Sequence, residues 1–66
     1  MALNTITLTR RDNAWQADYA QHPRGEQWRQ VFGTSVQRLP LSSVATEKMV
    51  LAWMRQREPD AVLLIQ

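Results

Sequence analysis

The feature that most restricts the fold is an alternation of apolar and polar residues on both sides of the pair Asp12-Asn13. Residues 4–11 and 14–20 each alternate with the two-residue period of a half-buried strand. Asp and Asn both tolerate the left-handed backbone of a tight turn. A hairpin that turns here brings the apolar side chains onto one face, with the expected pairs Arg10–Trp15, Leu8–Ala17 and Ile6–Tyr19. A shift of one residue would scatter these side chains over both faces, so the pattern predicts the hairpin and its register.

Length and cysteine count limit how such a chain is stabilised. Because the chain has 66 residues, folding hides only about 60% of the surface that the unfolded chain exposes. The sequence contains no cysteine, which excludes a disulfide and a Cys-based zinc site. We therefore expect a thin core, stabilised by packing or by a second copy of the chain.

The middle of the chain predicts a short helix followed by an edge strand. Pro23 suits a first helical turn and Gly33 suits the position just past a helix end, so we expect an α or 3₁₀ segment over residues 24–32. Its apolar residues recur at i, i+3 and i+4, as Trp28, Val31 and Phe32. Residues 34–45 have no clean period but favour extended structure. Pro40 lacks a backbone donor, so a strand here should lie at a sheet edge or end at this residue.

The clearest helix is predicted over residues 46–57. Thr46 suits the N-cap, Glu47 places negative charge in the first turn, and arginines occupy the last turn. Pro59 ends the helix. One apolar stripe runs along it, formed by Met49, Val50, Trp53 and Met54.

The last segment, AVLLIQ at residues 61–66, is apolar without alternation, which is typical of a strand covered on both faces. We therefore expect an inner strand of the sheet, or a strand covered by another subunit. A strand, a helix and a final strand also fit a right-handed crossover, which would make the last strand parallel to the one before the helix. Together the elements predict a single α+β domain over residues 1–66, ordered β-β-(short helix)-β-α-β, with the main helix on one face of the sheet.

The arginines are the main candidates for contacts with an anion. The net charge is only +2, and the candidate anion contacts are Arg10, Arg11, Arg24, Arg29, Arg55 and Arg57. If they converged on one face with Trp15 or Trp28, they would form a platform for phosphates and bases. The alternative is an evenly charged surface, which we favour because acids are interspersed along the chain.

Residues suited to catalysis are sparse. His22 is the only histidine, and Asp18 and Glu26 each lie four residues away. It could be a proton carrier oriented by a carboxylate, but we favour a solvated loop histidine because no nucleophile is arranged near it. The acids lack metal-ligand spacing and are explained by solvation, and the two glycines form no phosphate cradle. We expect no catalytic residue, no metal, no cofactor and no small-molecule substrate.

The sequence also bears on location. The start, MALNTITLTRR, has no uninterrupted apolar run, so we expect no signal peptide. No stretch approaches the roughly eighteen apolar residues of a membrane span. The lack of cysteine fits a reducing compartment. These observations predict a cytoplasmic protein without a membrane partner.

In the order of its elements, the chain resembles the small β-β-β-α-β modules of HicB-type antitoxins. The likeness covers most of the chain and rests on the hairpin DNAWQADYA, with Trp15, Ala17 and Tyr19, and on the Gly-Thr turn, the amphipathic helix and the closing strand. The segment HPRGEQWRQVF is an insertion relative to that pattern. The resemblance implies a partial ribonuclease-H fold that lacks catalytic residues and acts by occluding a toxin partner.

We therefore expect a non-enzymatic binding protein that acts through a protein–protein interface and self-associates, in particular as a homodimer. The thin core, the three tryptophans and the apolar last segment favour this function. The candidate interface residues are Trp28, Phe32, Leu63 and Ile65. The alternative function is binding of nucleic acid through the arginines and an exposed aromatic residue.

Overall fold

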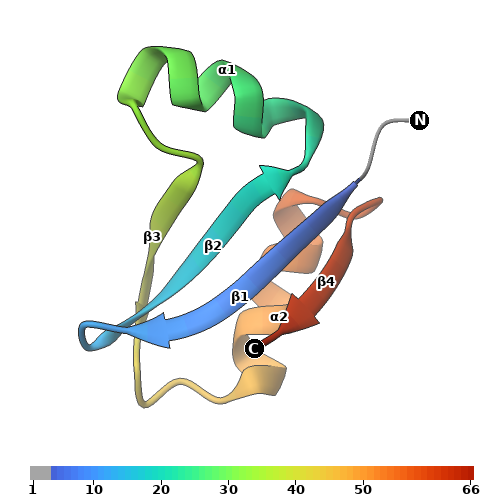
Figure 1. Ribbon diagram of the computed structural model, residues 1–66. Helices are drawn as coiled ribbons and strands as arrows, with labels where there is room; N and C mark the ends of the chain where they lie inside the picture. Colours follow the sequence, from blue (N-terminus) through green and yellow to red (C-terminus); the bar gives the residue numbers. More distant parts are fainter. Residues whose placement is uncertain (1–3) are drawn as a thin grey trace.

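The computed structural model describes residues 4–66 as a four-stranded mixed sheet with two helices, an α+β fold (Figure 1). Residues 1–3 lie outside the described residues, and they include the start of MALNTITLTRR, where no signal peptide is expected. The elements follow the predicted order, as β1 (Thr5–Arg11), β2 (Ala14–Gln21), α1 (Pro23–Phe32), β3 (Val36–Ser42), α2 (Glu47–Arg57) and β4 (Val62–Ile65). Across the sheet the strands lie in the order β3-β2-β1-β4.

The β1–β2 hairpin forms at the predicted turn. Asp12 and Asn13 have φ angles of 55° and 65°, the left-handed values that a two-residue hairpin loop requires. The predicted register is confirmed in the pairs Thr7–Asp18, Leu8–Ala17, Thr9–Gln16 and Arg10–Trp15. Beyond Thr7 the register shifts at a bulge, and the predicted pair Ile6–Tyr19 falls within it. Both side chains of that pair are nevertheless buried.

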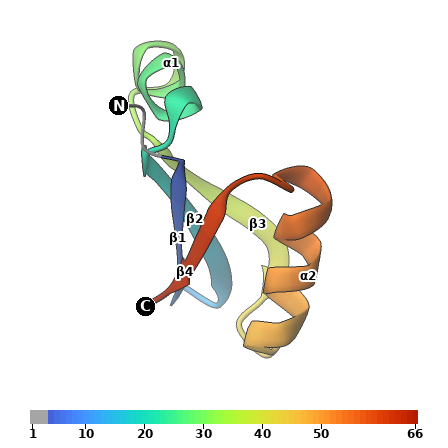
Figure 2. The same ribbon diagram turned by 90° about the vertical axis from the view of Figure 1, so that its right-hand side faces the viewer.

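The core lies between the sheet and α2, which covers one face (Figure 2). Its largest fully buried side chains are Trp15, Ile6, Leu8, Met54 and Val50. The Thr46 hydroxyl caps α2 by accepting from the Met49 N–H, as predicted. Met49 itself is 54% exposed, so its assignment to the buried stripe was wrong. The buried side is turned slightly, because Leu51 takes the place of Met49 beside the predicted Val50, Trp53 and Met54.

Helix α1 confirms the predicted short helix and lies across one end of the sheet (Figure 1). Its end is set by Gly33, whose φ of 78° is left-handed and whose N–H donates to the Arg29 carbonyl. Gly25 allows the helix to approach β2, because a Cβ at this position would lie 1.9 Å from the Tyr19 carbonyl oxygen. Trp28 then packs on Tyr19, with ring centroids 4.3 Å apart.

The two edges of the sheet were not predicted equally well. β3 is an edge strand that contains Pro40, as expected. β4 pairs with β1 in parallel. β1 and β3 are both antiparallel to β2, so β4 also runs parallel to β3, the strand before α2, as expected. The prediction of an inner strand was wrong, because β4 is the other edge. Its outer side chains Val62 and Leu64 are 55% and 49% exposed.

Candidate protein-interaction surface

The face of the sheet opposite α2, here called the outer face, is the main surface without internal packing. Within residues 4–66 no helix lies over it, and Figure 2 shows the sheet edge-on with α2 on the other side. The hairpin and β4 registers place its side chains in rows across the strands. One row contains Leu64, Thr7, Asp18 and Val36. The outer face is therefore polar in the middle and apolar along β4 and at Val36 on β3.

The main apolar part of this face is the pair Val62 and Leu64, here called the outer strip, and Val36 on β3 is a third exposed apolar side chain. Parallel pairing places Val62 beside Thr5 and Leu64 beside Thr7. Because successive side chains of a strand point to opposite faces, Leu63 and Ile65 point toward the core instead, where they are half-buried. The strand thus has apolar side chains on both faces, and only one face packs against the rest of the chain.

The backbone of β4 has a neighbouring strand on one side only, within the part of the chain that the structure describes. Toward β1, the Val62 N–H donates to the Asn4 carbonyl at 2.7 Å, and the Gln66 N–H donates to the Leu8 carbonyl at 2.9 Å. In a strand, backbone groups alternate in direction like the side chains. The N–H and C=O groups of Leu63 and Ile65 therefore point away from β1, and we call them the open edge.

A shallow hollow of about 120 Å³ lies beside the outer strip. Its walls come from β1, β2, β3 and the last residue, as Thr9, Arg11, Gln16, Asp18, Val36 and Gln66. The lining is mainly polar and includes one cation and one anion. It adds hydrogen-bonding groups to the rim of the apolar surface.

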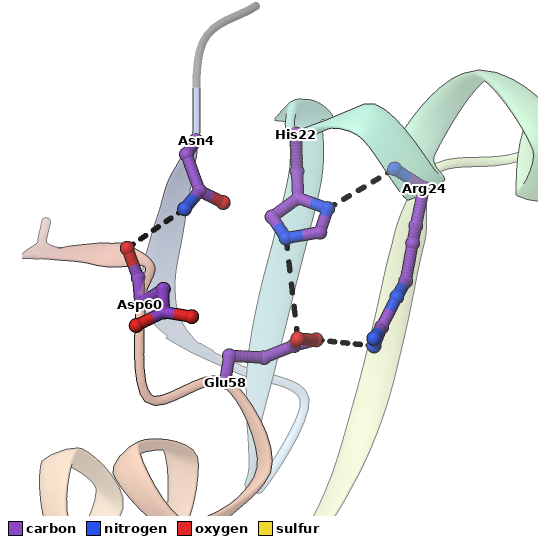
Figure 3. A network of polar contacts seen from close by, with 5 residues as sticks. All are labelled: Asn4, His22, Arg24, Glu58 and Asp60. Carbon is purple, nitrogen blue, oxygen red and sulfur yellow. Dashed lines mark hydrogen bonds and ion pairs between the residues drawn. The ribbon is translucent and has the colours of Figure 1, made fainter.

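The most tightly connected polar cluster lies elsewhere, where α1 begins and α2 ends (Figure 3). The Glu58 carboxylate is buried and forms an ion pair with the Arg24 guanidinium. The Nε2 atom of His22 lies 4.0 Å from the same carboxylate. Next to it, the Asn4 side-chain amide donates to the Asp60 carbonyl at 2.7 Å. These contacts join the two helix ends and the start of β1.

The structure corrects the interpretation of His22 as a solvated loop residue. Its side chain is 7% exposed and is the N-cap of α1, because Nδ1 accepts from the Arg24 N–H at 3.0 Å. The carboxylate near it is Glu58 and neither of the acids four residues away. Glu58 is itself 6% exposed, so solvation does not explain this acid. Its position 36 residues along the chain from His22 left no local signal in the sequence.

Burial changes the acid–base behaviour of this cluster. Loss of solvation lowers the pKa of His22, and the nearby Arg24 lowers it further, while Glu58 opposes both effects. A lowered pKa agrees with the geometry, since the capping bond requires an unprotonated Nδ1. Loss of solvation also raises the pKa of Tyr19, with Glu58 as the second cause. The cluster thus favours a neutral His22 and a neutral Tyr19.

The four candidate interface residues are placed differently from one another. Trp28 is half-buried against Tyr19, and Phe32 is 65% exposed at the end of α1. Leu63 and Ile65 lie on the core-facing side of β4. The sequence did not identify the outer strip. The alternation in β1 would have done so only with the pairing of β1 and β4 known, because Val62 and Leu64 lie beside Thr5 and Thr7 on the polar face of β1.

The arginines are distributed over both ends of the molecule. Arg10 stacks over the Trp15 ring at 4.7 Å and donates to Ala45, just before α2. Arg24 pairs with Glu58, just after α2. The eleven residues of this helix separate the two sites by about 16 Å.

The other cationic side chains also have separate surroundings. Arg57 stacks over Trp53 at 4.2 Å, and Arg11 lines the hollow. Arg38, which was not among the candidates, donates to the Asp12 carbonyl. Arg29 and Arg55 lie exposed on α1 and α2. Trp15, one of the two aromatic residues proposed for a base-stacking platform, is 1% exposed.

Among residues 4–66, no three or more His, Asp or Glu side chains are grouped so that they could hold a metal ion. Neither helix in the described region has the length and apolar character needed to cross a membrane. Comparisons with models of protein families, with curated proteins and with solved structures gave no match.

Proposed function

We propose that this chain is a non-enzymatic, cytoplasmic binding protein that acts through a protein–protein interface on β4 and self-associates through it. The observation that carries the proposal is that the side chains of Val62 and Leu64 are each about half exposed, on a sheet face that no described helix covers. Each half-exposed Val or Leu side chain would gain about 1 kcal/mol on full burial. Two copies would contribute four such side chains, about 4 kcal/mol in total, which only reaches the lower end of the cost of association, so hydrogen bonds along the strand edge must supply the rest and the dimer should be weak.

The surroundings of the titratable residues support a binding role over a catalytic one. A general base needs a lone pair that can reach a substrate proton. The Nδ1 lone pair of His22 is engaged by the Arg24 N–H. Nε2 lies 4.0 Å from the Glu58 carboxylate, and the His22 and Tyr19 rings pack in a T-shaped arrangement with centroids 5.0 Å apart. His22 therefore fits a structural role.

Nucleic-acid binding is the second candidate, and it has less support. Stacking of bases requires aromatic rings on an accessible, positively charged surface. The outer face carries Arg11 and Arg38 but also Asp18, and Tyr19 and Trp15 point into the core. Affinity for a random single strand that falls steeply as salt is raised would favour this second function.

Sedimentation equilibrium tests the proposed function. The wild-type chain should show a mass above 7.7 kDa that rises with concentration. Replacing both outer-strip residues, in the variant V62K/L64K, should restore the monomer mass. The matched control is V44K, because Val44 is 87% exposed but lies in the turn before α2. A wild-type chain that stays monomeric up to millimolar concentration contradicts the proposal.

A further inference from the structure

We propose that two copies of the chain join by antiparallel pairing of their β4 strands, which forms one continuous eight-stranded sheet. This inference rests on the proposed function and specifies its geometry. The strand order would be β3-β2-β1-β4 in one subunit, continuing into the same order reversed in its partner. The two-fold axis would run perpendicular to the sheet, so both copies of α2 would lie on the same side.

The first argument is the chemistry of the edge. An exposed edge strand offers unpaired N–H and C=O groups to another strand unless charges, proline or a bulge prevent it. β3 has such protection, since Arg38 and Pro40 lie within it and its register with β2 is irregular. β4 consists of four apolar residues and pairs with β1 without a register shift. The chain therefore leaves one edge able to accept a strand.

The second argument is that β4 is complementary to itself. Two identical strands related by a two-fold axis place each side chain opposite its counterpart or a near neighbour, and any charge there would meet a like charge. β4 has no charged residue, so this repulsion does not arise. An unrelated partner strand would gain nothing from this property, whereas a second copy makes direct use of it.

The third argument fixes the register. To form hydrogen bonds, Leu63 and Ile65 must lie opposite residues of the partner whose N–H and C=O groups also point away from that subunit's own β1. Placing Leu64 on the two-fold axis pairs Leu63 with Ile65 of the partner subunit, and the reverse, which uses every open-edge N–H and C=O group of both copies. A register centred on Leu63 would instead place Ile65 opposite Ala61 of the partner subunit. The N–H of Ala61 already donates to the Glu58 carbonyl within its own chain, so this register would satisfy fewer groups of the open edge.

This register makes a specific contact on the outer face. The two Leu64 side chains would form a directly opposed pair, with Cβ atoms about 4.5–5.5 Å apart. Each Val62 would face Gln66 of the partner subunit. The two Val62 residues would then lie more than about 13 Å apart, because four strand positions separate them along the edge. Residues 62 and 64 thus share a face and a similar exposure but differ in their distance to their own counterpart.

A cysteine cross-linking experiment uses this difference, and the chain has no native cysteine to interfere. Under mild oxidation, L64C should form a disulfide-linked dimer at least about tenfold faster than V62C, because only the opposed pair has a geometry that a disulfide can bridge. Equal rates for L64C and V62C, or faster linkage of V62C, would overturn the register and with it the inference.

A charge-exchange experiment complements the cross-linking and does not depend on oxidation. L64K and L64E should each weaken self-association at least about a hundredfold, because like charges would oppose one another. An equimolar mixture should restore dimers of mixed composition. If wild-type dimers form but the mixture stays monomeric, the pairing geometry is wrong and the proposed function survives. If the wild-type chain itself is monomeric at millimolar concentration, both fail.

Discussion

The end of the molecule where α1 begins and α2 ends differs from the open edge of β4 in whether its bonding groups find partners within the chain. At the closed end, formed by Tyr19, His22, Arg24, Gly25 and Glu58, polar groups are paired within the chain and backbone atoms are in close contact. Along β4, apolar side chains and backbone donors remain accessible. The contacts at the closed end stabilise a single chain, whereas the side chains and backbone groups along β4 are available to a second chain.

Because of this difference, we expect variants in the two regions to have different effects. Changes at the closed end should lower the free energy of unfolding without altering the association of the folded chains. Changes to the outer strip should alter association and leave the stability of the monomer nearly unchanged, since exposed side chains contribute little to it. The outer-strip variants are described above, and the four predictions below test the closed end and the protected edge of β3, from the largest expected effect to the smallest.

The largest effect is expected from Gly25→Ala. The added Cβ would meet the Tyr19 carbonyl oxygen at 1.9 Å, so α1 or β2 must shift, at a cost of about 3 kcal/mol or more. Urea denaturation should show a large decrease in the unfolding midpoint. Gln27→Ala, on an exposed position of the same helix, is the control and should change stability by less than about 0.5 kcal/mol. Equal stability of G25A and wild type would contradict the close contact.

An intermediate effect is expected from Arg24→Ala. Removing the guanidinium leaves the buried Glu58 carboxylate without its ion pair, at a cost of about 1–2 kcal/mol, less than for a buried pair because Arg24 is 55% exposed. The pKa of His22 should rise, since Arg24 lowers it and Glu58 raises it. NMR titration of the single histidine measures this shift directly. An unchanged pKa in R24A would separate His22 from the Arg24–Glu58 pair.

A smaller effect is expected from pH. Because burial lowers the pKa of His22 in the folded chain, the unfolded chain binds more protons below its own pKa of about 6.5. Stability should therefore fall as the pH drops below about 6.5, and this contribution should level off below the folded pKa. His22→Asn keeps an N-cap that does not titrate and should show a weaker dependence. Identical pH profiles for H22N and wild type would refute the assignment.

The smallest effect is expected at the protected edge. Pro40→Val would restore a backbone N–H to β3 and remove one obstacle to strand pairing, while Arg38 would remain. We expect masses above the dimer only at the highest concentrations in sedimentation velocity experiments. Strong assembly of the variant at low concentration would show that Pro40 alone protects this edge. Wild-type behaviour at all concentrations would show that Arg38 and the irregular register suffice.

The parts of the fold that could be predicted from sequence depend on local signals. The hairpin followed from alternation around Asp12-Asn13, the helix ends followed from Thr46 and Gly33, and the edge position of β3 followed from Pro40. Each of these signals acts within a few residues of its effect, so spacing alone reveals it.

The parts that could not be predicted depend on contacts between distant positions. An apolar run such as β4 fits an inner strand or an edge strand equally well, because the lateral order of strands is decided by packing of the whole sheet. The same applies to Glu58, which contacts His22 and Arg24 across more than thirty positions. As a result, the sequence pointed to Leu63 and Ile65, whereas their neighbours Val62 and Leu64 are the more exposed pair.

Amide hydrogen exchange by NMR at two protein concentrations tests the central claim most directly. In dilute solution, the amides of Leu63 and Ile65 should exchange fast, while those of Val62, Leu64 and Gln66 should be protected by β1. Raising the concentration should slow exchange at Leu63 and Ile65 and leave the other three unchanged. Rates at Leu63 and Ile65 that are independent of concentration, up to the millimolar range, would contradict pairing of the open edge with a second copy.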